Sequence, residues 1–161
     1  MRFPFSVNSI RSVLAVLAVS LFVPRGVPVR AAAASVPENS PVGRWKTIDD
    51  KTGKAKSIVG ISERSGKLFG TIETLLDPPE PHPTCKLCTG SNKDRPLVGL
   101  QIMWGFQADG SEWSGGQVLD PETGKIYHAT LTLENSGKQL RLRGYIGIPL
   151  LGRTQRWQRE E

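Results

Sequence analysis

The chain has 161 residues and a formal net charge of +6, which taken alone favours a nucleic-acid or anionic-membrane partner. Four arginines and no acidic residue lie in residues 1–34, before an expected cleavage site, so 17 basic and 15 acidic residues remain and the net charge falls to +2. The remaining basic residues form no cluster with interleaved aromatic residues apart from the last strand, so we expect no nucleic-acid partner. About 127 residues are left, which is enough for one domain and excludes a second.

Residues 1–34 have the pattern of a secretory signal peptide. Arg2 and Arg11 precede an apolar run over residues 12–23, and four alanines end at Ala34. The apolar run is too short to cross a bilayer comfortably, so a retained anchor is the weaker alternative. We expect an exported mature chain without a transmembrane segment, in the periplasm or, as the alternative, outside the cell. The polar, proline-containing residues 35–42 are predicted to be a flexible leader.

Residues 43–159 are predicted to form an all-β domain. Turn-forming residues followed by glycine recur along this region, and they suit hairpin connections. Regular spacing without long helical periods favours an antiparallel meander over a parallel sheet. The candidate strands are residues 43–49, 55–62, 67–75, 98–106, 112–119, 125–134, 138–146 and 153–159.

Alternation of apolar and polar residues predicts which face of each strand is buried. Residues 125–134 and 139–146 each have one apolar face, and alternation across residues 97–104 places Trp104 with Ile102, opposite Met103. About eight such strands can close on themselves or form a sandwich. Closure removes exposed sheet edges, so we predict a single up-and-down barrel, with a β-sandwich as the alternative.

The two ends of the strand-rich region carry matched tryptophan motifs. Gly43 and Trp45 open the first candidate strand, and Arg156 and Trp157 lie in the last. A small barrel needs a large ring across one mouth, and an arginine stacked on that ring can join the last strand to the first. We predict that these four residues close the barrel.

The long loop before the fourth candidate strand contains Cys85 and Cys88. In an exported protein two cysteines at this spacing are expected to form a disulfide. A zinc site that recruits His82 is an alternative without an evident fourth ligand, and a thiol–disulfide centre would need a helix after the first cysteine. Covalent haem is excluded because Thr89, not histidine, follows Cys88. We expect no metal and no cofactor.

Two resemblances follow from these residues. The triplet at residues 43–45 with a final-strand arginine is similar to the lipocalin-like (calycin) signature. The region 42–159 as a whole resembles the bacterial family called domain of unknown function 2147, which implies an exported protein with a lipocalin-like β-barrel and no established activity. The motifs that carry this resemblance are residues 43–45 (GRW), 66–70 (GKLFG), 85–88 (CKLC), 99–100 (GL), 115–121 (GGQVLDP), 124–127 (GKIY), 143–147 (RGYIG) and 152–157 (GRTQRW).

No catalytic motif is present, so we do not expect an enzyme. The two histidines, His82 and His128, lack a nucleophile elbow, phosphate loop or zinc-binding helix around them. The first functional hypothesis is a small apolar or amphipathic ligand held in the barrel mouth. The alternative is a non-catalytic interaction or structural module of the envelope, with a filled barrel whose cysteine loop meets a protein partner. The candidate ligand-contacting residues are Trp104, Trp113, Tyr127, Arg143 and Tyr145.

Overall fold

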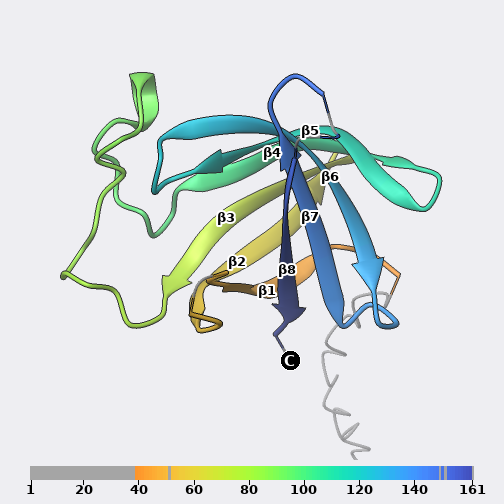
Figure 1. The fold of residues 1–161 in the computed structure, drawn as a ribbon, viewed down its shortest axis with the longest axis horizontal. Helices are drawn as coiled ribbons and strands as arrows, with labels where there is room; N and C mark the ends of the chain where they lie inside the picture. Colours follow the sequence, from red (N-terminus) through yellow and green to blue (C-terminus); the bar gives the residue numbers. More distant parts are fainter. Residues whose placement is uncertain (1–38, 51, 149, 151, 161) are drawn as a thin grey trace, which may run out of the picture. The chain divides into compact units, whose positions relative to one another are not determined.

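A computed structural model of the chain describes residues 39–50, 52–148, 150 and 152–160 (Figure 1). The predicted signal peptide and residues 35–38 of the predicted leader lie outside the described residues. None of the helical structure that is described has the length and apolar character needed to cross a membrane. The described elements are β1 (Gly43–Ile48), β2 (Ala55–Arg64), β3 (Lys67–Leu75), the 3-10 helix η1 (Gly90–Asn92), β4 (Gln101–Asp109), β5 (Glu112–Asp120), β6 (Lys125–Glu134), β7 (Gln139–Tyr145) and β8 (Arg153–Arg159).

The eight strands of the described region form a closed antiparallel barrel. Each strand pairs with the next along the chain, and β1 pairs with β8 through Trp45–Arg159 and Lys46–Gln158 (Figure 1). The predicted up-and-down barrel is therefore confirmed, and the sandwich alternative is not formed. Most of these connections are short turns, and a connection of a few residues joins only antiparallel neighbours; the long connection is the one between β3 and β4.

The β5–β6 turn shows how the sequence makes these connections. The amide of Gly124 donates to the carbonyl of Asp120 at 2.8 Å, and the Asp120 carboxylate accepts from the amide of Glu122 at 2.9 Å. Gly124 has a φ of +69°, a left-handed conformation that glycine adopts without strain. The turn predicted from this aspartate–glycine spacing is the one that forms.

Bulky side chains are buried inside the barrel. Phe106 and Met103 are fully buried, and each packs against a strand residue that lacks a side chain. A Cβ on Gly70 would lie 2.8 Å from Sδ of Met103, and a Cβ on Gly116 would overlap the ring of Phe106. The glycines thus provide the volume that the larger side chains occupy.

Trp45 and Arg159 close one end of the barrel. Trp45 is fully buried, and its indole Nε1 donates to the carbonyl of Pro41 at 2.8 Å. The Arg159 guanidinium lies 4.2 Å from the indole centroid and donates to the carbonyls of Ser40 at 2.8 Å and Gly137 at 2.7 Å. This arginine therefore stacks on the ring and satisfies backbone carbonyls of two segments at once.

The prediction of an arginine over Trp45 is confirmed, but the residue is Arg159 and not Arg156. Alternation along β8 places Arg156 on the opposite face from the buried Trp157, where its Nε lies 3.2 Å from the Glu134 carboxylate. Gly43 lies at this end, against Arg159. Its φ is +135°, and a Cβ there would lie 2.9 Å from Nη1 of Arg159.

The end of the predicted flexible leader is packed against this closure. Pro41 is fully buried, and Val42 packs on the core. The carbonyl of Pro41 accepts the indole hydrogen of Trp45, and that of Val42 accepts from Arg159 at 3.1 Å. Residues 41–42 are part of the closed end, because the two large side chains need these carbonyls as acceptors.

Candidate functional site

The loop between β3 and β4 is an ordered structure of its own. Cys85 and Cys88 are joined by a disulfide, with Cα atoms 5.3 Å apart, and both are buried. The amide of Cys85 donates to the carbonyl of Arg95 at 2.8 Å, and Thr84 and Pro96 form a bridge beside it. The predicted disulfide therefore lies inside a small antiparallel arm, which we call the cysteine arm (residues 83–97).

The cysteine arm packs against the β5–β6 turn. Sγ of Cys85 lies 3.6 Å from the carbonyl oxygen of Pro121. Gly124 leaves room for the carbonyl of Leu87, because a Cβ at position 124 would overlap that group. The disulfide closes the arm on itself, and these two contacts place the arm, with the residues that it carries, against the barrel.

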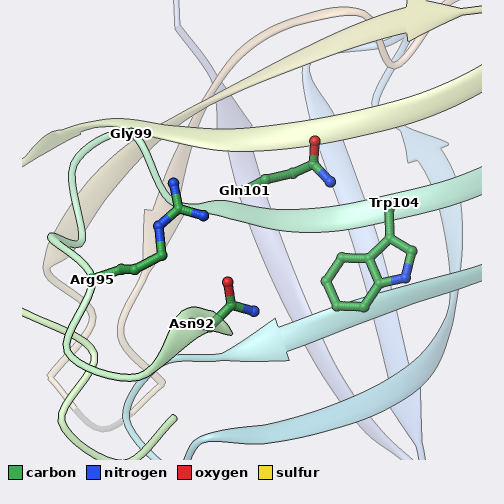
Figure 2. A pocket seen from close by; sticks show the side chains of 5 residues that line it. All are labelled: Asn92, Arg95, Gly99, Gln101 and Trp104. Atoms are coloured by element: carbon green, nitrogen blue, oxygen red, sulfur yellow. The ribbon is translucent and has the colours of Figure 1, made fainter. Parts of the chain in front are cut away.

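A pocket of about 500 Å³ lies between the cysteine arm and β4, and we call it the outer pocket. Asn92 and Arg95 approach from the arm, and Gln101 and Trp104 project from β4, with Gly99 between the two segments (Figure 2). Two features that the sequence presents separately, the cysteine pair and Trp104, therefore contribute to one site.

Trp104 reaches this pocket because it lies on the outer face of the barrel. It pairs with Phe69 in β3 and with Gln117 in β5, whereas its neighbour Met103 is fully buried inside. The indole Nε1 donates to Oε1 of Gln117 at 3.0 Å. The ring is half-buried and held in orientation, and part of it lines the pocket.

Trp104 lies opposite Met103, as predicted, but its predicted place on one face with the buried Ile102 is wrong. On β3 the adjacent Leu68, Phe69, Gly70 and Thr71 pair with Phe106, Trp104, Met103 and Gln101 of β4. Ile102 and Gly105 are therefore extra residues, and each extra residue shifts the alternation by one position. The two bulges place Trp104 and Gln101 outside and Met103 and Phe106 inside.

The pocket is positively charged and lacks a carboxylate among its described lining residues. Arg95 is exposed, and its guanidinium has neither a hydrogen-bond partner nor an ion-pair partner within the described part of the chain. Arg64 lies nearby, 4.2 Å over the centroid of Phe69, and donates to Oε1 of Gln101 at 3.2 Å. Several other exposed or half-buried arginines are paired with acids: Arg44 with Glu73 at 2.8 Å, Arg153 with Asp50, and Arg141 and Arg156 with Glu134.

The arrangement suits binding and offers no group for acid–base or nucleophilic chemistry. Its described lining supplies one aromatic face, two amides and one guanidinium, which together fit a ligand with an apolar face, polar substituents and negative charge. Within the ranges that the structure describes, no group of three or more histidine, cysteine, aspartate or glutamate residues is placed to hold a metal ion.

The other candidate ligand-contacting residues divide between two faces. Trp113 and Tyr127 are on the inner face, because their cross-strand partners Leu131 and Val118 are buried. Both are half-buried and pack against the core. They do not meet Trp104.

Arg143 and Tyr145 are on the outer face. Arg143 donates to Oγ1 of Thr154 and to the carbonyl of Leu150, each at 3.2 Å. Tyr145 stacks on His128 with ring centroids 5.9 Å apart and planes at 29°. The five candidates therefore do not form one barrel mouth.

Sequence reasoning missed Asn92, Arg95 and Gln101. The first two lie in a segment without strand or helix periodicity, and the arm alone brings them to β4. The available signal was the cysteine pair itself, since a local disulfide in a proline-rich loop indicates that the shape of the loop is fixed.

Comparison with known proteins agrees with the fold. Protein HP1028 of Helicobacter pylori, described as belonging to the lipocalin family, is 20% identical, with a TM-score of 0.66 over 76% of this chain and 84% of that chain. At this identity the likeness shows the fold alone. No curated protein matches the chain. The model of a family described as uncharacterized protein conserved in bacteria (DUF2147) matches residues 43–159, and the chain belongs to this family.

Proposed function

We propose that the protein is an exported, non-catalytic binding protein whose ligand occupies the outer pocket, with the filled barrel as its scaffold. The observation that carries this proposal is that Trp104 lines one pocket with an arginine, Arg95, that has no partner among the described residues and lies in an arm shaped by a disulfide. An unpaired guanidinium and an oriented aromatic ring in one pocket are typical of a recognition site, because folding alone gains little from that placement.

The packing of the barrel supports a site on the outside. Phe106 and Met103 occupy the space beside Gly116 and Gly70 in the middle of the barrel. A lipocalin-type ligand needs that space to be open. A filled scaffold instead gives the outer face a rigid base.

Export to the periplasm is part of the proposal. A buried disulfide persists in an oxidising compartment, and the pattern of residues 1–34 is typical of a secretory signal peptide. The described pocket lining contains no acid, histidine or thiol, which supports binding without catalysis.

A second candidate function is a ligand in the barrel mouth. Trp113 and Tyr127 favour it, because both face inward yet are only half-buried. Aromatic side chains at such positions can contact a small apolar molecule.

Native mass spectrometry of protein purified from its own cell envelope tests the proposal. We expect a retained molecule on the wild type and on Trp113→Phe, and its loss from Trp104→Ala, with matching circular dichroism spectra as the folding control. Retention by Trp104→Ala together with loss from Trp113→Phe would assign the ligand to the barrel mouth and contradict the proposal.

A further inference from the structure

We propose that the outer pocket binds a carboxylated sugar within an acidic glycan. This inference rests on the proposed function and names the class of its ligand. In the proposed complex Trp104 stacks on the apolar face of the sugar ring, Arg95 pairs with the carboxylate, and the amides of Asn92 and Gln101 hydrogen-bond to hydroxyl groups. Figure 2 shows these four side chains around the pocket.

The charge of the ligand follows from the arginine. Arg95 has no carboxylate partner in the described residues, and none of the described lining residues is acidic. A guanidinium offers parallel donors that match the two oxygens of one carboxylate. Phosphate sites more often gather convergent backbone amides or several cations, which this pocket does not show.

The sugar character follows from the amides and the ring. Oε1 of Gln101 already accepts from Arg64 at 3.2 Å, so its amide hydrogens are left to donate into the pocket. Asn92 adds a group that both donates and accepts, as a hydroxyl does. An open pocket with such a lining suits a polar ligand that keeps part of its water, whereas a lipid needs an enclosed apolar one.

The outer face continues from the pocket with residues of the same kind. Trp104 pairs with Gln117, Gln117 with His128, and His128 with Tyr145, on four adjacent strands. Neighbouring strands are about 4.8 Å apart, so a chain that leaves the pocket along this row meets an amide and then the stacked His128–Tyr145 pair. Longer acidic glycans are therefore expected to bind more tightly than their monomers.

Isothermal titration calorimetry of the full-length mature protein tests the ligand class. The probes are oligogalacturonate, oligomannuronate and oligosialate, each beside its neutral methyl ester and its monomer. We expect at least one acidic glycan to bind, its ester to bind at least about tenfold more weakly, and its monomer to bind more weakly than the chain.

Matched variants test whether the glycan binds in the outer pocket. Arg95→Ala and Trp104→Ala are expected to weaken binding by about tenfold or more, and Trp104→Phe to retain part of it. Arg156→Ala removes another exposed arginine, one that is paired with Glu134 outside the pocket, and is expected to leave affinity unchanged.

The inference is overturned if no acidic glycan binds more tightly than its ester. It is also overturned if inorganic phosphate or oligothymidylate competes at Arg95 more strongly than every glycan, although the outer pocket would then remain the binding site. Glycan binding that survives Arg95→Ala and Trp104→Ala but is lost in Trp113→Phe would contradict the proposed function as well, so the two failures are distinguishable.

Discussion

Two tryptophan–arginine pairs lie in opposite surroundings in this molecule. Trp45 is fully buried under Arg159, whose guanidinium donates to the carbonyls of Ser40, Val42 and Gly137. Trp104 is half-buried on the outer face and lines one pocket with Arg95, whose guanidinium meets no partner in the described part of the chain. The first pair is explained completely by folding, whereas the second is not.

The difference shows how a structural role is separated from a binding role when residue types are the same. The two roles are told apart by whether the donors of the guanidinium have acceptors within the protein. A guanidinium that is shielded from water needs such acceptors, whereas an exposed guanidinium at a pocket can keep its donors for a ligand. The two pairs should accordingly respond differently to equivalent substitutions.

The largest expected effect is that of the two tryptophans on stability. Trp45→Ala should lower the free energy of unfolding by about 3–5 kcal/mol, because it empties the closed end and leaves the Pro41 carbonyl without a donor. Trp104→Ala should cost about 1 kcal/mol, since part of the ring is already exposed. Urea denaturation measures the free energy of unfolding of both variants. Equal losses in the two variants would remove the distinction between the two sites.

The arginines should follow the same order with smaller values. Arg159→Ala should cost about 2–3 kcal/mol, because three partly buried carbonyls lose a charged donor. Arg95→Ala should stay within about 0.5 kcal/mol of the wild type. Thermal unfolding compares the stability of the two variants. A loss for Arg95→Ala as large as that for Arg159→Ala would contradict this account.

A pair of glycines tests whether the barrel is filled. Gly116→Ala should cost about 1–3 kcal/mol, because its methyl group must displace the ring of Phe106. Gly144→Ala is the matched control, since its methyl group would meet Tyr127 at an ordinary 3.5 Å. Urea denaturation should separate the two variants, and a neutral Gly116→Ala would indicate free space in the barrel.

The disulfide is expected to matter more for ligand affinity than for stability. The double variant Cys85→Ser/Cys88→Ser should lose at most about 2 kcal/mol, because so short a loop has little entropy to lose. Its acidic-glycan affinity should nevertheless fall, since the arm places Asn92 and Arg95. Unchanged affinity in calorimetry, with the disulfide absent by mass spectrometry, would show that the arm holds its shape without the bond.

The same two regions show which features of the structure could be predicted from the sequence. Glycine turns and alternation are local, so strand order and the closed barrel followed from them, as did a final-strand arginine over Trp45. The choice between Arg156 and Arg159 needed the β1–β8 register, which depends on contacts between the two ends of the chain.

The outer pocket was not predictable for two physical reasons. Ile102 and Gly105 form bulges that shift the inside–outside alternation of β4, and alternation alone cannot reveal an extra residue. Asn92 and Arg95 reach β4 only through the folding of the cysteine arm, which depends on tertiary contacts such as Cys85–Pro121. Trp104 was identified as a candidate residue, but its face and its neighbours were not.

The most direct test of the outer pocket as the binding site follows the four tryptophan indole N–H signals of the protein in a nitrogen-15 correlation spectrum. The labelled protein is titrated with the acidic glycan that binds most tightly. We predict that the Trp104 signal shifts in proportion to saturation while those of Trp45, Trp157 and Trp113 stay in place. A shift of Trp113 with Trp104 unchanged would place the ligand inside the barrel and contradict the assignment of the outer pocket.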